Sequence, residues 1–171
     1  MENIEIKARV ENPERIKDVL KILGPTFIGL DHQIDTYFRM TNGRCKLRES
    51  SLSGSHLIIY LRENLTGPKR SVYHIIPIDD KTGFTNLFNK MQGIQVVIEK
   101  TREIYLYDNI RIHLDNVKKL GNFIEFEAVM DDKHHNKNTE IAKIKNLLAK
   151  LEIKEENLIK GSYENLIELL G

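Results

Sequence analysis

Two glutamates one residue apart, Glu125 and Glu127, have a type and spacing that could do chemistry. Apolar residues alternate with them over residues 123–129, so a strand there would place both carboxylates on one face. Carboxylate oxygens are hard ligands, and two on one face suit Mg²⁺ or Mn²⁺. An alternating pair of this kind is usually exposed to solvent, so it indicates a metal site only where other residues support it.

Basic residues that suit phosphate follow the same alternation in other segments. In residues 3–10, Glu5, Lys7 and Arg9 face one way and apolar residues face the other. Arginine offers phosphate a bidentate fork, and lysine offers a point charge. On the charged faces of the predicted strands the basic residues outnumber the acidic ones, although the net charge of the chain is only +1. The basic residues are Lys7, Arg9, Arg44, Lys46, Arg48, Arg62, Lys100, Arg102 and Arg111, and the acidic residues are Glu5, Asp115, Glu125 and Glu127.

The elements that must position these side chains are strands joined mostly by hairpin-length turns, together with four amphipathic helices. Short joints predict an α+β arrangement in which about eight largely antiparallel strands form the sheet and the helices pack outside it. The predicted strands cover residues 3–10, 27–38, 44–49, 57–62, 70–78, 95–107, 110–117 and 123–129. The predicted helices cover residues 13–23, 81–92, 139–151 and 162–170.

The charged face of this sheet is either open to solvent or enclosed. If the helices pack on the apolar face, the charged face is left as open surface or as the inner wall of a barrel. Eight strands close into a barrel with room for side chains or one small ligand. Enclosed charges lose water and need compensation, which a multiply charged anion and a divalent cation would supply. The residues alone leave the two arrangements equally favoured.

Composition limits the class of protein. The chain of 171 residues is 40% apolar and 30% charged, which suits a single globular domain covering residues 1–171. A net charge of +1 gives no general attraction to nucleic acid or to an acidic membrane. The single cysteine, Cys45, on the apolar side of its strand, fits a reducing compartment. No window approaches the roughly 20 apolar residues that span a bilayer, and the first residues do not form a signal peptide. We therefore expect a cytoplasmic protein.

An ordered set of short motifs resembles one known family. Each motif is weak alone, and their order along nearly the whole chain is specific. In one-letter code they are NIEIKAR from residue 3, QIDTYF from 33, GRCKLRE from 43, LIIYLR from 57, EKTR from 99, HLDNV from 113, LGNFIEFE from 120 and GSY from 161. The sequence is similar to the CYTH superfamily of triphosphate tunnel metalloenzymes, and in particular to the branch of class IV adenylyl cyclases and thiamine triphosphatases.

The resemblance implies a closed eight-stranded antiparallel barrel, with helices packed outside, whose charged interior binds a triphosphate. It implies that Glu5, Glu125 and Glu127 hold Mg²⁺ or Mn²⁺. Lys7, Arg102 and Asp115 are the implied catalytic residues, and Asp115 matches a position that supports a second metal ion or an attacking water. The implied phosphate-binding residues are Lys7, Arg9, Lys46, Arg48, Arg62, Lys100, Arg102 and Arg111.

One position departs from the family pattern. The family signature is Glu-x-Glu-x-Lys, and here Asn3 takes the place of the first glutamate, while Glu5 and Lys7 are retained. Asn3 can still offer a carbonyl oxygen but carries no charge, which weakens a second metal site. Another feature of the sequence is the place of the last predicted helix, residues 162–170, which suggests that it closes one mouth of the tunnel.

The resulting hypothesis is a metal-dependent enzyme acting on ATP, tripolyphosphate or thiamine triphosphate. Attack by water would release phosphate, and attack by the ribose 3′-hydroxyl of ATP would give cyclic AMP and pyrophosphate. Two alternatives remain open: a module that binds polyphosphate or a nucleotide without turnover, and a structural barrel with internal ion pairs. No nucleic acid or membrane partner is expected, and the protein would be a monomer or a homodimer.

Overall fold

In the computed structural model, which describes residues 1–134 and 136–170, eight strands form one closed barrel. The strands follow the order β1-β5-β4-β3-β2-β6-β7-β8 around the barrel, and neighbouring strands are antiparallel. The predicted fold class is therefore confirmed. The strands are β1 (Glu2–Arg9), β2 (Thr26–Phe38), β3 (Arg44–Ser50), β4 (Gly54–Arg62), β5 (Lys69–Pro77), β6 (Ile94–Tyr107), β7 (Ile110–Val117) and β8 (Gly121–Met130).

Strand β1 shows how alternation in the sequence builds the two sides of the wall. Ile4 and Ile6 point outward into an apolar cluster and are 0% and 1% exposed. Glu5 and Lys7 point inward and line the central cavity. Because β1 pairs with both β5 and β8, it closes the barrel, and its register places Lys7 opposite Glu125.

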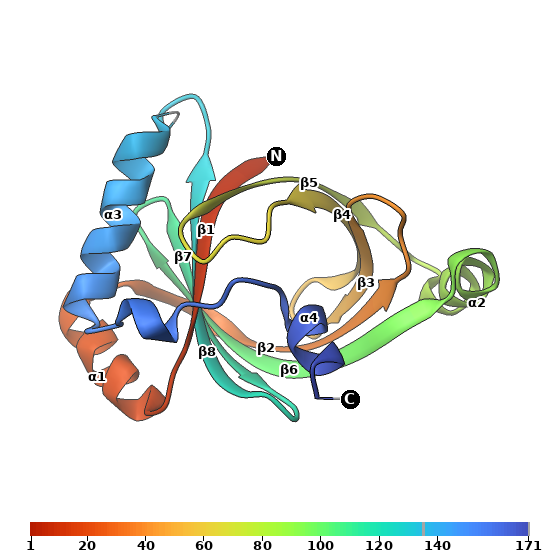
Figure 1. The fold of residues 1–171 in the computed structure, drawn as a ribbon, viewed down its shortest axis with the longest axis horizontal. Helices are drawn as coiled ribbons and strands as arrows, with labels where there is room; N and C mark the ends of the chain where they lie inside the picture. Colours follow the sequence, from red (N-terminus) through yellow and green to blue (C-terminus); the bar gives the residue numbers. More distant parts are fainter. Residues whose placement is uncertain (135, 171) are drawn as a thin grey trace.

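Helices α1 (Pro13–Leu23) and α3 (Lys137–Lys150) cover the outer face of β1, β7 and β8 on one side of the barrel (Figure 1). Helix α1 begins as predicted, because the side chain of Asn12 accepts a hydrogen bond of 3.1 Å from the backbone N–H of Arg15. Full burial of an apolar side chain is worth about 1.5–3 kcal/mol, so the packing of α1 and α3 on these strands is a major source of stability. The buried apolar residues of the two helices are Ile16, Leu20, Ile144, Leu147 and Leu148.

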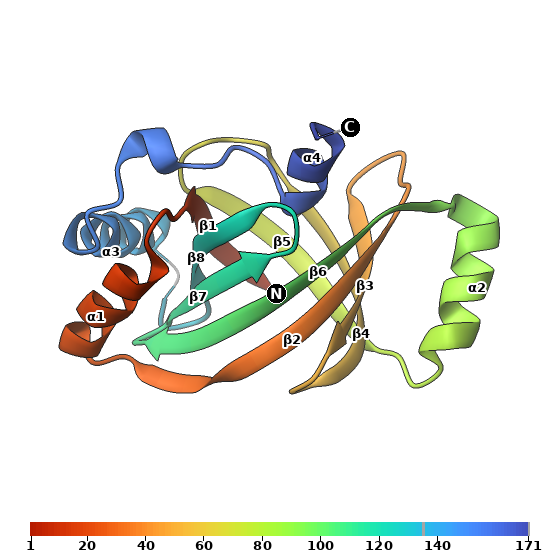
Figure 2. The same cartoon turned by 90° about the horizontal axis from the view of Figure 1, so that it is seen from below.

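Helix α2 (Lys81–Gln92) lies at the opposite side of the molecule (Figure 2). Its Phe84 and Phe88 rings pack on Phe38 of β2, with ring centroids 6.1 and 4.9 Å from that of Phe38. Cys45 belongs to the same apolar cluster and is 1% exposed, so its predicted place on the apolar side of the sheet is confirmed.

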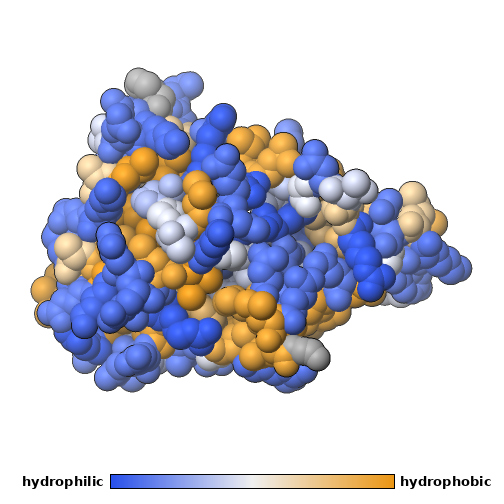
Figure 3. Space-filling view, viewed as in Figure 1, coloured by the Kyte–Doolittle hydropathy of each residue, from blue (hydrophilic) through white to orange (hydrophobic). Residues whose placement is uncertain are grey.

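The C-terminal segment differs from the other helices. Helix α4 (Tyr163–Glu168) follows a short 3₁₀ turn at Glu155–Asn157 and is shorter than predicted. It lies across one end of the barrel instead of on the outer face (Figures 1 and 2). Hydrophobic residues gather beside the C-terminus on this side of the molecule (Figure 3), where Leu169 and Leu170 are exposed. None of the helices in the described part of the chain is both long and apolar enough to cross a membrane.

Candidate functional site

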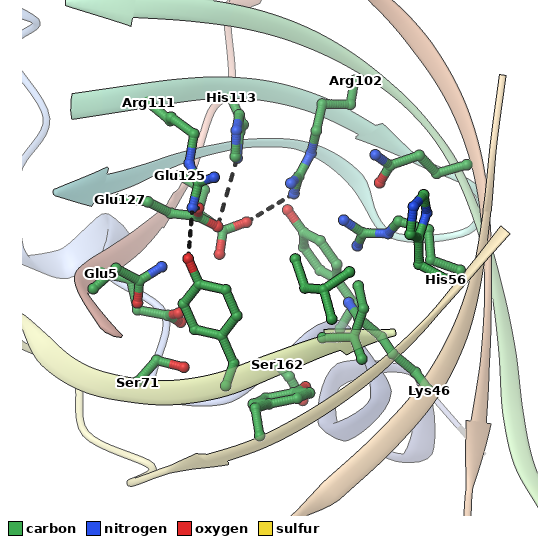
Figure 4. A pocket seen from close by; sticks show the side chains of 18 of the residues that line it. Glu5, Lys46, His56, Ser71, Arg102, Arg111, His113, Glu125, Glu127 and Ser162 are labelled. Atoms are coloured by element: carbon green, nitrogen blue, oxygen red, sulfur yellow. Dashed lines mark hydrogen bonds and ion pairs between the residues drawn. The ribbon is translucent and has the colours of Figure 1, made fainter. Parts of the chain in front are cut away.

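The barrel encloses a cavity of about 410 Å³, and its wall includes side chains from all eight strands and from the start of α4. Most of the wall is polar or charged, and its isoleucines are Ile58 and Ile75, which pair across β4 and β5, and Ile104 of β6, which pairs with His113. In Figure 4, Glu125, Glu127 and His113 lie together on one side of the cavity, and Lys46 lies on the other. The predicted site residues that line it are Glu5, Lys7, Lys46, Arg48, Arg62, Lys100, Arg102, Arg111, Glu125 and Glu127.

Arg9 lies apart from this wall. Its side chain is at the exposed edge of the barrel, where Nη1 donates a hydrogen bond of 2.8 Å to the backbone carbonyl of Leu120. The guanidinium also lies 4.8 Å from the centroid of the Phe123 ring. Arg9 thus holds the turn between β7 and β8, and the structure does not bring it to the other predicted phosphate-binding residues.

Asp115 lies behind Arg102, and its oxygens are surrounded by donors. Arg102 donates to both oxygens over 2.6 Å, the Tyr163 hydroxyl donates over 2.6 Å, and Nζ of Lys100 is 3.4 Å away. Arg102 also donates a hydrogen bond of 2.8 Å to Glu125, which places it between two carboxylates. Burial opposes ionisation, but the charges of Arg102 and Lys100 outweigh it and hold the pKa of Asp115 far below its usual range.

Asp35 is a site residue that the sequence reasoning missed. It is 1% exposed, accepts hydrogen bonds of 2.7 Å from Nε and Nη2 of Arg48, and accepts one of 2.9 Å from Lys46. Burial and the neighbouring Arg48 lower the pKa of Lys46 to about 8. The signal in the sequence was spacing: Gln33, Asp35 and Tyr37 are two residues apart and so share a face of β2, and Gln33 and Tyr37 line the cavity.

Lys69 is a second residue that was missed, since it lies at the very start of its strand. It is 2% exposed, and its Nζ donates to the carbonyl oxygen of Leu65 over 2.8 Å and to those of Ile159 and Lys160 over 3.3 Å. Burial lowers its pKa to about 8. Lys69 therefore ties the loop before β5 to the C-terminal segment.

His113, Glu125 and Glu127 form the group best suited to a metal ion. One ligand atom from each residue lies within 4.8 Å of the others. Burial and the charge of Arg102 lower the pKa of His113 to about 3, so its imidazole is neutral, as a metal ligand must be. Its Nδ1 atom is buried and makes no hydrogen bond, so it is free to bind an ion. Nothing in the sequence singled out His113 as a ligand.

Glu5 and Asn3 lie beside this group without belonging to it. Glu5 is opposite Glu127 in the strand register and forms an ion pair with Arg62. Burial and the negative charge of Glu125 raise the pKa of Glu5, which is the effect expected where carboxylates converge. Oδ1 of Asn3 is buried without a hydrogen bond and is a neutral oxygen ligand available to an ion.

A sequence model of the CYTH domain matches residues 1–163. The chain belongs to the CYTH family. A putative adenylate cyclase of Methanocaldococcus jannaschii is 29% identical over the whole of this chain and 99% of its own length. The PH1012 protein of Pyrococcus horikoshii has a solved structure that matches with a TM-score of 0.83 and 28% identity, covering 96% of this chain and 98% of that protein.

A more distant structure shares the CYTH fold. The HpAC1 protein of Hippeastrum, described as a putative adenylyl cyclase with a dominant triphosphatase activity, matches with a TM-score of 0.64 and 14% identity, covering 94% of this chain and 91% of that one. At this identity the match shows the fold alone. Proteins named for two different activities thus share this barrel, and the fold by itself does not choose between them.

Proposed function

We propose that this CYTH protein is a metal-dependent enzyme that acts on a triphosphate held inside the barrel. One observation carries the proposal: buried basic residues from several strands converge on a cavity beside a carboxylate and imidazole group. The relative in Methanocaldococcus jannaschii, a putative adenylate cyclase, supports a nucleoside triphosphate as the substrate.

The basic residues bind the triphosphate by exchanging partners. In the structure Arg62 is paired with Glu5, Arg111 with Glu127 over 2.7 Å, and Arg102 with Glu125. A phosphate chain entering the cavity offers these guanidinium groups bidentate oxygen partners. Hydrogen bonds to charged groups contribute roughly 1.5–3 kcal/mol each, so several such contacts decide the class of ligand.

The carboxylates released by this exchange, Glu125 and Glu127, would hold Mg²⁺ or Mn²⁺ together with His113. The free Nδ1 of His113 and the free Oδ1 of Asn3 fit an ion with nitrogen and oxygen ligands. When bound, such an ion neutralises phosphate charge and polarises the attacking oxygen. Lys7, whose Nζ lies 3.5 Å from Glu125, and Arg102 then stabilise charge on the leaving phosphate. Asp115 holds Arg102 in position, because its own oxygens already accept hydrogen bonds.

Two reactions fit this arrangement. Attack by water on the terminal phosphorus releases inorganic phosphate, and attack by the ribose 3′-hydroxyl on the α-phosphorus of ATP forms cyclic AMP and releases pyrophosphate. The neighbouring side chains of Ile58 and Ile75 offer an apolar surface for the organic part of a substrate beside the phosphates. We therefore propose an organic triphosphate as a better substrate than tripolyphosphate.

Product analysis tests the proposal. The protein is incubated with Mg²⁺ or Mn²⁺ and ATP, tripolyphosphate or thiamine triphosphate, and products are separated by chromatography. Cyclic AMP with pyrophosphate identifies a cyclase, and inorganic phosphate identifies a triphosphatase. Glu125→Gln should remove metal-dependent turnover, while Glu99→Gln, which changes an exposed ion pair with Lys118, should leave it unchanged. Equal loss in both variants, or no loss in Glu125→Gln, would contradict the assigned site.

A second candidate function is a module that binds triphosphate without turnover. Asn3 favours it, because the family pattern has a negatively charged glutamate at this position. In that case triphosphate raises the melting temperature, no product forms with any metal, and Asn3→Glu is the variant expected to gain metal-dependent turnover.

A further inference from the structure

The cavity differs at its two ends. Strand β3 runs from Arg44, which donates a hydrogen bond of 2.5 Å to Glu164 of α4, to the β3–β4 turn at the other end of the barrel. At the α4 end, the lining residues Tyr163, Tyr37 and Tyr60 are at most 9% exposed. At the other end, Ser53 is exposed and Ile75 is 40% exposed. The cavity is therefore open at the β3–β4 turn and covered at α4.

Tyr163 forms the cover, and it is fixed from several directions. Its hydroxyl donates a hydrogen bond of 2.6 Å to Asp115, and the centroid of its ring lies 3.6 Å from Nζ of Lys7 and 5.0 Å from Nζ of Lys100. The ring also packs against Phe123, with centroids 5.0 Å apart. A side chain held by a hydrogen bond and two cations forms a firm wall.

The backbone before Tyr163 is fastened to the barrel as well. The N–H of Ile159 donates a hydrogen bond of 2.8 Å to the carbonyl oxygen of Lys7, and Leu158 forms a β-bridge with Ala8. The buried Lys69 binds the next two carbonyl oxygens, as described above. The C-terminal segment thus continues the wall and closes this end of the cavity.

We propose that Tyr163 is the end wall of a one-ended phosphate site, so that this protein takes the end of a phosphate chain and not an internal stretch of it. This inference rests on the proposed function, since it concerns how the triphosphate lies in the same cavity. The chain enters past Ser53 and Ile75 with its terminal phosphate first. That phosphate meets Lys7 and Lys100 at the closed end, and the organic group remains toward the open end.

The stoichiometry of binding to linear polyphosphate tests this inference. A one-ended site accepts at most two protein molecules per chain, one at each end, whatever the chain length. A tunnel open at both ends can be threaded, so the number bound grows with length. We would mix the protein with linear polyphosphate of two defined lengths and Mn²⁺, in the cold so that turnover is slow. Sedimentation would then give the mass of each complex. The chains would be examined by electrophoresis afterwards.

The expected result is two protein molecules on both lengths, displaced by excess tripolyphosphate. Shortening of the chains from their ends alone agrees with the proposal, whereas internal cuts, or loading that grows with length, would overturn it. Tyr163→Gly should allow loading to grow with length, and Tyr163→Phe, which keeps the ring, should retain two. If Tyr163→Gly does not fold, the wild-type stoichiometry still decides. Failure to bind either tripolyphosphate or ATP with Mn²⁺ would instead refute the proposed function.

Discussion

Asp35 compensates two positive charges inside the barrel, since its buried carboxylate forms ion pairs with both Arg48 and Lys46. Removing one partner of a buried ion pair leaves the other charges uncompensated and typically costs about 3–5 kcal/mol. We expect Asp35→Asn to lower the free energy of unfolding by that order, measured by urea denaturation. Glu99→Gln, at an exposed ion pair, should have an effect several-fold smaller. Equal effects in the two variants would contradict the role of Asp35.

Lys46 should take up a proton when a triphosphate binds near pH 8. In the free protein its pKa is lowered to about 8, mainly by burial, so part of the population is neutral there. A polyanion beside it raises this pKa again and draws in a proton. In the free protein, burying the charged form costs stability at pH values below about 8, and this cost falls as the pH rises toward the unfolded-state pKa.

Calorimetry in buffers of different ionisation enthalpy measures this uptake. Lys46→Arg is the matched control, because arginine stays charged throughout. Near pH 8 the wild type should take up more protons than Lys46→Arg, and near pH 6 the two should agree. Equal uptake at both pH values would show that Lys46 does not face the phosphates.

The alternation of single residues explains how much of the site the sequence could predict. It correctly placed Glu5, Lys7 and most of the basic residues on one wall, because side chains in a strand alternate strictly. His113 was on the predicted charged side but was not chosen as a ligand. Its grouping with Glu125 and Glu127 depends on the register between β7 and β8 and on the depth in the barrel, which one strand alone does not reveal.

At the scale of elements, α4 depends on a latch formed by Arg44 and Glu164. Both side chains are largely buried, and Arg44 also donates a hydrogen bond of 3.2 Å to the backbone carbonyl of Arg62. We expect Glu164→Gln to loosen the C-terminal segment while leaving the barrel folded. Trypsin should then cleave after the exposed Lys160 faster than in the wild type, which mass spectrometry would detect.

Glu168→Gln is the control for this latch. Glu168 accepts a hydrogen bond from Gln95 at the exposed surface, so its change should leave the cleavage rate nearly the same. If Glu164→Gln is cut no faster than Glu168→Gln, the ion pair with Arg44 does not hold α4 in place.

The residue ranges of most strands and helices could be predicted from the sequence. The contacts that dock α4 on the barrel were the hardest feature to predict. Turn residues and apolar stripes gave strand and helix positions to within a few residues, since those signals are local. The sequence predicted four helices outside the sheet, and the place of the last one suggested that it closes a mouth of the tunnel; α4 does lie over one end of the barrel. Its docking depends on Asp115, Arg44 and Lys69, which are distant in sequence, and no local pattern carries that information.

At the scale of the whole molecule, metal and triphosphate should bind with positive coupling. The carboxylates of the cavity form ion pairs with its arginines. A metal ion alone would draw carboxylates away from the arginines, and a triphosphate alone would draw arginines away from the carboxylates. Either ligand alone therefore leaves charged groups without partners. We expect Mn²⁺ to bind more tightly in the presence of a non-hydrolysable triphosphate, and the triphosphate to bind more tightly with Mn²⁺ by the same factor.

Titration calorimetry of each ligand with and without the other measures this coupling. The affinity of Mn²⁺ for the free triphosphate must be measured separately and subtracted. Glu127→Gln, which removes the partner of Arg111, should reduce the coupling factor. Independent binding of the two ligands to the wild type would contradict the proposed exchange of partners.

The closure of the barrel by β1 has a consequence for how the protein is made. β1 leaves the ribosome before the other seven strands of the barrel, and its partner β8 follows far later, because Glu2 pairs with Met130. Until then one edge of β1 has unpaired backbone groups, which are prone to join other chains. Pairing across such long stretches is slow, on a scale of milliseconds to seconds. The nascent chain is therefore most vulnerable to aggregation during translation, and lowering the growth temperature should increase the soluble yield.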